Sequence, residues 1–383
     1  MRYLYILLLS TSLFSAVNAQ GWLARSDFGG VGRHRGTGIS IGNKGYIGLG
    51  HVNGTGVNVS YNDWWQYDPA ANTWTQKANY VTASYGAVAF GTSTKGYVGG
   101  GTAFTTQYFE YNPVTNLWTG IANCPLTISN QTAFSVEDKG YVILGNQIAE
   151  FNPILNSWVM KANLPASLNI WSTSFVVGTS AFVKNGNQLY EYKPAQDTWL
   201  PRASCSGIAT GGSSAFTVGE KGYIISGYSG SLANVTKEVW QFNPATNTWL
   251  QMSDFDGAAR RFSVGFNVNG RGYFGSGTNG INFNDFWAFD HFLALEKTSA
   301  IVDCSVFPNP TTDVLNFRIN NANETSPVKL EIFDLTGKMV NTATVDQHTF
   351  SISLQELPSG IYTYALSIDG KIVKSDNIQK TGL

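Results

Sequence analysis

The chain has 383 residues, of which 13% are charged, about half the share usual in soluble proteins, whereas glycine (41 residues) and aromatic side chains (14%) are abundant. A formal net charge of −1 provides no electrostatic basis for binding nucleic acid or an anionic membrane surface. The cysteines Cys124, Cys205 and Cys304 are too few and too scattered for a disulfide framework. This composition suits short strands joined by tight turns.

The N-terminus has the pattern of a secretory signal peptide. Met1-Arg2 precedes an apolar run from Leu4 to Phe14, and small side chains at Val17 and Ala19 precede an expected cut. The run is shorter than the roughly 20 residues that a membrane-spanning helix needs. We predict a signal peptide at residues 1–19 and a mature chain from Gln20. No cysteine follows the cut, so we expect no lipoprotein anchor and no membrane span.

A glycine-tyrosine motif recurs along the following part of the chain, and such self-similarity indicates a repeat fold. It occupies residues 44–50, 95–101, 139–145, 221–227 and 271–277, with a degenerate copy at 181–186. The first five copies in chain order are each followed by an aromatic residue, a proline turn and a tryptophan: Trp74, Trp118, Trp158, Trp199 and Trp249. The last copy stops at Phe289-Asp290 without its tryptophan.

The missing tryptophan is supplied by the other end of the chain. The segment from Trp22 to Phe28 matches that from Trp249 to Phe255, and an arginine follows each. We therefore expect residues 21–25 to form the outer strand of the last repeat. A ring closed in this way has no exposed sheet edge.

The repeats resemble the kelch family, in which a glycine-rich strand precedes Asn-Asp-x-Trp-x-Tyr-Asp and a tryptophan. Residues 62–68 and 284–290 match that middle element closely, and the resemblance covers Gly21 to Asp290. It implies an all-β fold, a six-bladed β-propeller with four antiparallel strands per blade, which we place at residues 20–291. We expect the repeat tryptophans to pack between blades.

The repeats differ in one class of loop, that between the second and third strands of a blade. These loops are longest in blades five, six and one, which are neighbours in a closed ring, and shortest in blades three and four. Because strands alternate in direction, the loops share a face with the blade-to-blade connectors. Variable loops on a rigid scaffold often bind ligands, so we expect a ligand on this face. Solvent-exposed loops without a binding role would show the same variation in length.

The connectors that enter this sector carry basic residues. Arg33 and Arg260 align with an arginine common in kelch repeats, so a scaffold role is expected for them. The repeat does not explain Arg35, Arg261 and His34, and guanidinium groups pair well with carboxylates. Trp64 also lies outside the pattern and would either stack on a sugar or pack at a strand edge. The candidate ligand-binding residues are Arg35, Arg261, His34, His51 and Trp64.

Enzymatic chemistry has less support. Kelch propellers include copper oxidases of galactose, whose site needs two histidines and two tyrosines, one of which is cross-linked to cysteine. The histidines of this propeller are His34, His51 and His291, and Cys124 and Cys205 lie two blades apart. We assign no catalytic residue, no metal and no cofactor. A sialic-acid mutarotase, also a six-bladed kelch protein, stays open as an epimerase-like alternative because it needs little beyond an acid-base group beside an arginine. Glu220 and Glu238 cannot be placed at a site from sequence.

A second pattern follows a linker expected at residues 292–302. Alternating strands bounded by Thr-Gly, Ser-Gly and Asp-Gly turns predict a small Ig-like β-sandwich at residues 303–383. Pro308-Asn-Pro310, Asp334-Leu-Thr-Gly-Lys338, Leu357-Pro-Ser-Gly-Ile-Tyr362, and Lys371 with Lys374 resemble the type A sorting domain of the type IX secretion system of Bacteroidetes. The resemblance implies export across the outer membrane, often with cleavage of the domain and attachment to lipopolysaccharide. A generic Ig-like binding module is the alternative.

These observations predict a secreted or surface-attached recognition protein. We expect a carbohydrate or acidic glycan on the loop face of blades five, six and one, and the type IX machinery as partner of residues 303–383. A mutarotase-like enzyme is the second hypothesis, and a protein-binding adhesin the third. No nucleic-acid partner is expected.

Overall fold

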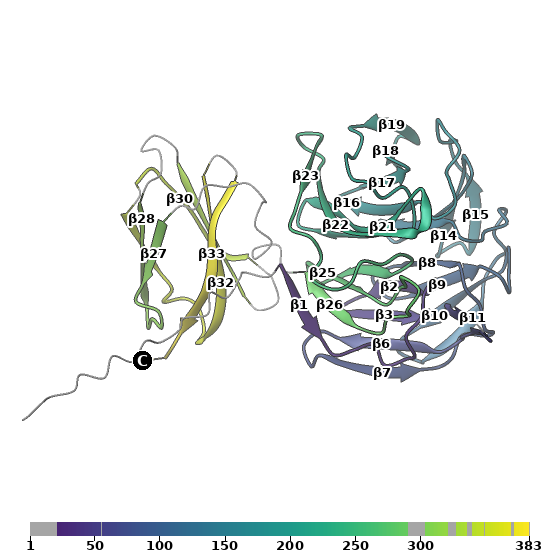
Figure 1. The fold of residues 1–383 in the computed structure, drawn as a ribbon, viewed down its shortest axis with the longest axis horizontal. Coiled ribbons are helices and arrows are strands. Elements are labelled where there is room, and N and C mark those ends of the chain that lie inside the picture. The colour runs from purple at the N-terminus through teal and green to yellow at the C-terminus, as the bar shows by residue number, and fades with distance from the viewer. Residues whose placement is uncertain are drawn as a thin grey trace, which may run out of the picture.

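The computed structural model describes residues 21–54, 56–289, 303–320, 327–334, 339–347, 349–368 and 371–382. The predicted signal peptide, the predicted linker and the Thr-Gly and Asp-Gly turns at 336–337 and 369–370 lie outside the described residues. Every regular element among the described residues is a β-strand (Figure 1). The expected all-β class is confirmed.

Six four-stranded antiparallel sheets form the blades of a propeller. From the axis outward, blade one contains β2 (Thr37–Ile41), β3 (Lys44–Gly48), β6 (Trp64–Asp68) and β7 (Thr73–Lys77). Blade two contains β8 (Ala87–Gly91), β9 (Gly96–Gly100), β10 (Tyr108–Asn112) and β11 (Leu117–Gly120). Blade three contains β12 (Thr132–Val136), β13 (Lys139–Leu144), β14 (Gln147–Asn152) and β15 (Ser157–Met160).

The second half of the ring repeats this arrangement. Blade four contains β16 (Thr173–Val177), β17 (Ser180–Asn185), β18 (Gln188–Lys193) and β19 (Thr198–Arg202). Blade five contains β20 (Ser214–Val218), β21 (Lys221–Ser229), β22 (Ser231–Asn243) and β23 (Thr248–Gln251). Blade six contains β24 (Val264–Val268), β25 (Arg271–Gly275), β26 (Phe286–Phe289) and β1 (Trp22–Arg25).

The first strand of the chain completes the last blade. β1 pairs antiparallel with β26, with Trp22 opposite Phe289. Trp22 is 1% exposed and packs against Phe255 and Phe289, each with its ring centre 4.9 Å away. The innermost strands contact one another in the order β2, β8, β12, β16, β20, β24 and back to β2. The first and last strands of the propeller, β1 and β26, therefore close one ring around a central axis.

Glycine in the repeated Lys-Gly-Tyr segment makes room for the neighbouring blade. A Cβ atom at Gly140 of blade three would lie 2.0 Å from the Phe90 ring of blade two, and one at Gly222 of blade five would lie 2.0 Å from the Phe175 ring of blade four. A side chain at either glycine would therefore push two blades apart. The repeat keeps glycine here because an inner-strand ring fills the space.

The repeated tryptophans of blades one to five fasten each of these blades to the preceding one. The Trp118 indole donates a hydrogen bond to the Ala78 carbonyl of the preceding connector (2.9 Å), and the Ala78 amide donates to the Asn116 side-chain oxygen (2.9 Å). Asn116 has a φ of 57°, a left-handed conformation that asparagine tolerates well. The same indole bond is made by Trp74, Trp158, Trp199 and Trp249. This geometry explains the constant spacing around each tryptophan.

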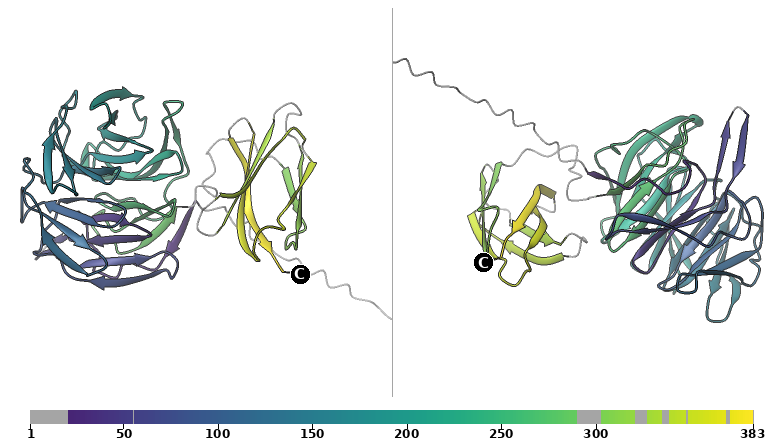
Figure 2. Two further views of the ribbon diagram at one scale, coloured as in Figure 1. Left: turned by 180° about the vertical axis from the view of Figure 1, so that it is seen from behind. Right: turned by 90° about the horizontal axis from the view of Figure 1, so that it is seen from below.

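The long loops and the connectors lie on one face, as expected. Residues at the end of three connectors form isolated antiparallel bridges with residues that follow a second strand: His34 with His51, Gly211 with Tyr228, and Arg261 with Thr278. In blade one the long loop is itself a hairpin of β4 (His51–Gly54) and β5 (Val57–Ser60). It stands out from the propeller in the right-hand view of Figure 2.

The C-terminal segment is a two-sheet sandwich. One sheet contains β27 (Asp303–Phe307), β28 (Val314–Asn320) and β31 (Thr349–Ser353). The other contains β30 (Met339–Val345), β29 (Val328–Phe333), β32 (Gly360–Ile368) and β33 (Lys371–Lys380). Leu315 and Phe317 of the first sheet and Leu330, Ile332 and Tyr364 of the second belong to one buried core. The predicted sandwich is therefore present.

Candidate functional site

One residue from each blade surrounds the central channel where the connectors end. We call these six residues the mouth ring. In the sequence each lies nine residues before the first position of the Lys-Gly-Tyr motif, which is Lys44, Lys95, Lys139, Ser180, Lys221 or Arg271. The mouth ring consists of Arg35, Gly86, Asn130, Trp171, Gly212 and Phe262.

The backbones of the mouth ring form a closed circle of hydrogen bonds. Each amide donates to the carbonyl of the mouth-ring residue in the preceding blade, and Arg35 donates to Phe262 to complete the circle. The six donor-acceptor distances lie between 2.8 and 3.2 Å. All six residues have a left-handed backbone, with φ between 55° and 66°. The ring therefore fixes both the position and the direction of its side chains.

A left-handed backbone is natural for glycine but unusual for large side chains. Trp171 has a φ of 66° and Phe262 a φ of 57°. Such strain costs about 1–3 kcal/mol per residue and is concentrated at functional sites. Because a glycine occupies the equivalent position in blades two and five, the scaffold does not require large side chains here. We infer that Trp171 and Phe262 are present for what they contact at the mouth.

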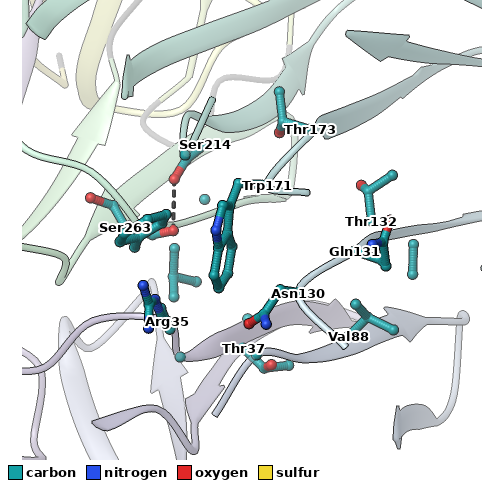
Figure 3. A pocket seen from close by; sticks show the side chains of 18 of the residues that line it. Arg35, Thr37, Val88, Asn130, Gln131, Thr132, Trp171, Thr173, Ser214 and Ser263 are labelled. Carbon is teal, nitrogen blue, oxygen red and sulfur yellow. Dashed lines mark hydrogen bonds between the residues drawn. The ribbon is translucent and has the colours of Figure 1, made fainter. Parts of the chain in front are cut away.

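The side chains of Arg35 and Trp171 lie close together at the pocket (Figure 3). Arg35 and Trp171 come from blades one and four, which are opposite each other. The guanidinium carbon of Arg35 lies 4.7 Å from the Trp171 ring centre and 4.7 Å from the Phe262 ring centre. The two aromatic rings are 4.5 Å apart. A guanidinium group is therefore held against two aromatic rings at the mouth.

A pocket of about 190 Å³ continues from the mouth ring into the channel. Its wall contains hydroxyl groups from several blades, with no carboxylate among the lining residues. Ser214 donates a hydrogen bond to the Ser263 carbonyl (2.8 Å). The side-chain oxygens of Asn130 and Gln131 are buried there without a hydrogen-bond partner. The lining therefore offers polar groups to a small polar ligand.

Two arginines at the mouth lack an acidic partner. Within the described part of the chain, neither Arg35 nor Arg261 forms an ion pair, and the Nε atom of each is buried without a hydrogen-bond partner. Burial lowers the pKa of both guanidinium groups, and Arg261 lowers that of Arg35 further. Both nevertheless stay charged at neutral pH. An unpaired, partly buried guanidinium is a favourable site for an anion.

Arg33 and Arg260 are different, as the sequence predicted. Each is fully buried and forms a two-pronged ion pair, Arg33 with Asp63 and Arg260 with Asp285. Arg33 also donates to the Leu49 carbonyl (3.1 Å). Each arginine thereby joins a blade-to-blade connector to the loop that precedes the third strand of its blade. They belong to the scaffold and not to the candidate site.

The two predicted histidines lie side by side next to the mouth. His34 and His51 are buried with ring centres 4.2 Å apart, and His51 stacks on Tyr85 at 3.9 Å. His34 Nε2 forms a hydrogen bond with the Asn53 side-chain oxygen (2.9 Å). Burial lowers the pKa of each imidazole to about 4, so both are neutral at pH 7. The guanidinium carbon of Arg35 lies over Tyr85, 5.9 Å from the centre of the tyrosine ring.

Trp64 does not belong to this site, and the sugar-stacking role considered for it is wrong. It is fully buried, stacks on Tyr46 at 5.9 Å and meets the Trp118 ring of blade two edge-on at 5.4 Å. The edge-packing alternative is the one the geometry supports. The equivalent residue of every other blade is also apolar and buried: Tyr108, Ile148, Leu189, Val239 and Phe286.

Sequence reasoning missed Trp171, Asn130, Tyr85 and Tyr228. The first two occupy mouth-ring positions, Tyr85 links Arg35 to His51, and Tyr228 packs on Phe262 at 5.9 Å. The constant nine-residue offset was a signal that could have identified the mouth ring. The contacts of Tyr85 and Tyr228 depend on folding and had no such signal.

The residues considered for catalysis lie elsewhere. Glu220 is in the exposed turn between β20 and β21, away from the mouth. Glu238 accepts hydrogen bonds from the Ile208 amide and the Trp240 indole between blades four and five. Cys124 and Cys205 are buried and unpaired. Among the described residues, no group of three or more histidine, cysteine or acidic side chains is placed to hold a metal ion.

Comparison with known proteins identifies the C-terminal segment and the fold. Residues 305–381 match the family described as "Secretion system C-terminal sorting domain". A search of the curated proteins finds no match to the chain. A solved structure titled "Structure of YjhT" is similar with a TM-score of 0.59 and 16% identity, over 68% of this chain and 95% of that chain. At this identity the similarity establishes the propeller fold alone.

The described part of the chain contains no helix able to cross a membrane. The matched family consists of C-terminal signals for export and surface attachment. Residues 305–381 are therefore a secretion-system sorting domain, and the protein is located outside the cell, either secreted or attached to the outer surface.

Proposed function

We propose that the propeller is an extracellular recognition module that binds a carboxylated sugar at the mouth of its central channel. The observation that carries this proposal is the pair of guanidinium groups, of Arg35 and Arg261, that have no carboxylate partner among the described residues. A carboxylate at the mouth would satisfy their free N–H groups. We also propose that the repeats belong to the kelch family and that the type IX secretion system exports the protein.

A sugar, rather than a simple inorganic anion, is favoured by the surroundings of the arginines. The half-buried Trp171 ring provides an apolar face on which a sugar ring stacks, and the buried Phe262 ring supports it at 4.5 Å. The free side-chain oxygens of Asn130 and Gln131 can accept hydrogen bonds from sugar hydroxyls. Aromatic faces beside a few polar groups are the usual composition of a small-molecule site.

A glycan array on the propeller, residues 20–291, tests the proposal. It should include terminal uronic and sialic acids, sulfated sugars, and for each acid the derivative whose carboxyl group is reduced to an alcohol. We expect the acids to bind at least about tenfold more tightly than the reduced derivatives, since a charged hydrogen bond contributes about 1.5–3 kcal/mol. Equal binding of acids and alcohols would exclude the carboxylate site.

The same array separates the two alternative functions. A mutarotase-like enzyme would accelerate anomeric exchange of a bound sugar, which nuclear magnetic resonance detects directly. Binding without exchange supports the recognition module. A protein-binding adhesin would bind none of the sugars.

A further inference from the structure

The hairpin of β4 and β5 stands beside the mouth and has two chemically different faces. Residues paired across a hairpin point to the same side, and side chains alternate along each strand. His51 pairs with Ser60 and Asn53 with Asn58, so these four residues form a polar face. Val52 pairs with Val59 and Gly54 with Val57, which form an apolar face.

The polar face is turned toward the mouth. The contacts of the His51 ring with His34 and Tyr85, and the hydrogen bond between Asn53 and His34 (2.9 Å), all come from this face. Tyr85 reaches Arg35 in turn. A continuous line of contacts therefore leads from the hairpin to the Arg35 guanidinium group at the mouth of the channel.

The outer part of the polar face is free for a ligand. Asn53 and Asn58 are exposed, and the Asn58 side chain has no hydrogen-bond partner among the described residues. The scaffold gives no reason for the hairpin, because the equivalent loops of blades three and four are short turns. An additional wall of carboxamide groups on one side of the mouth lengthens the surface available to a ligand.

The pocket limits how much of a glycan enters the channel. Its volume of about 190 Å³ lies below the roughly 300–1,000 Å³ typical of sites for drug-sized ligands. If an acidic sugar is held at Arg35, the next sugars of the same chain must lie outside the mouth ring. The polar face of the hairpin begins at that point.

We propose that the β4–β5 hairpin is a second subsite, where Asn58 and Asn53 bind the sugars that follow a terminal acidic residue held at the mouth. The protein then recognises the acidic end of an oligosaccharide and not a free monosaccharide. This inference rests on the proposed function and specifies its ligand class. The carboxamide groups donate to and accept from sugar hydroxyls.

Calorimetry with two probes tests the subsite: free glucuronic acid, and a trisaccharide with glucuronic acid at its non-reducing end. The wild-type propeller should bind the trisaccharide more tightly. Asn58→Ala should weaken the trisaccharide about fivefold, the loss of about one hydrogen bond, and leave glucuronic acid within about twofold. Asn58 is preferable to Asn53 because Asn53 also contacts His34.

Val57→Thr is the matched control, since Val57 is the adjacent residue on the opposite face and is 47% exposed. It should bind both probes as the wild type does, with an unchanged melting temperature. Equal affinities of the wild type for the two probes, or equal effects of Asn58→Ala and Val57→Thr, would overturn the subsite. If Arg35→Ala still abolishes glucuronic acid binding in that case, the proposed function survives. Failure of the wild type to bind either probe would overturn both.

Discussion

Arg35 and Trp171 come from opposite blades, yet the guanidinium carbon of Arg35 lies 4.7 Å from the Trp171 ring centre. The contact spans the axis because the closed circle of hydrogen bonds holds both residues in a left-handed backbone. The mouth of the propeller is thus built by backbone geometry and filled by side chains that differ from blade to blade.

The first prediction concerns the two unpaired arginines. Arg35→Ala and Arg261→Ala should each weaken an acidic sugar by about 1.5–3 kcal/mol, the usual contribution of a charged hydrogen bond. Neither residue has an ion-pair partner within the described part of the chain, so each variant should lose at most about 1–2 kcal/mol of stability, in Arg35→Ala from the contacts with Trp171 and Phe262.

Arg33→Ala is the matched contrast. It removes a fully buried arginine and leaves the Asp63 carboxylate without its partner. Breaking such a pair costs about 3–5 kcal/mol. Calorimetric binding and thermal unfolding of the three variants check both statements. A large loss of stability in Arg35→Ala would show that Arg35 belongs to the scaffold.

The second prediction concerns the strained tryptophan. Trp171→Asn should keep the melting temperature close to the wild-type value, because asparagine tolerates the left-handed backbone and already occupies the equivalent position of blade three as Asn130. Acidic sugar binding should weaken at least about tenfold, since the platform opposite Arg35 is lost. Unfolding and binding measured on one preparation separate the two effects. Unchanged binding would remove Trp171 from the site.

The third prediction concerns ring closure. Trp22→Ala should cost about 3–5 kcal/mol, the range for a buried tryptophan, and lower the melting temperature by about 10 °C. Removing residues 20–25 should cost more, because it also exposes the edge of β26. Val114→Ser is the control and should leave the melting temperature unchanged, because the Val114 side chain is 91% exposed. Differential scanning calorimetry measures all three, and an unchanged melt of the deletion would show that β1 does not close the ring.

The fourth prediction concerns export. Removing residues 303–383 should leave a folded propeller in the periplasm of its host, since the matched sorting domain is lost. Fractionation of cells followed by immunodetection locates the protein. Arg35→Ala in the full chain should be exported normally and serves as the control. Export of the truncated chain at the wild-type level would contradict a sorting role for this segment.

The fold could be predicted from the sequence because each blade repeats the same physical solution. Gly140 and four of its equivalents are glycine, with Ala181 in their place in blade four, and Trp118 and its equivalents lie at a constant distance from a turn, so each pattern was visible five times. The scaffold role of Arg33 followed from its equivalent, Arg260. Comparison between the repeats thus distinguished structural residues, which recur in several blades, from residues that occur in one blade only.

The site could be predicted only in part, and Trp64 shows why. It was considered for binding because the motif lacks tryptophan there, yet every blade places an apolar side chain at that position between blades. A large residue in a repeated core position changes packing and not function. Trp171 could not be predicted as a site residue, because its contact with Arg35 joins two blades that are far apart in the sequence.

The fifth prediction concerns pH and begins with the buried histidine pair. His34 and His51 have pKa values of about 4 in the folded protein, because burial disfavours the imidazolium form. Repulsion from Arg35 contributes to lowering the pKa of both histidines, and Arg261 contributes to lowering that of His34. In the unfolded chain both imidazoles return to the ordinary value near 6.5.

Between pH 6.5 and pH 4 the unfolded chain therefore binds more protons than the folded one, so stability rises with pH across this window and falls as acid is added. The melting temperature should drop by several degrees between pH 7 and pH 4.5. His51→Gln removes one titrating group and should show a smaller drop, whereas carboxylates that titrate in the same range affect both proteins equally. Thermal unfolding at pH 7, 5.5 and 4.5 gives the comparison. Equal drops in the two proteins would mean that His51 is not buried as a neutral imidazole in solution.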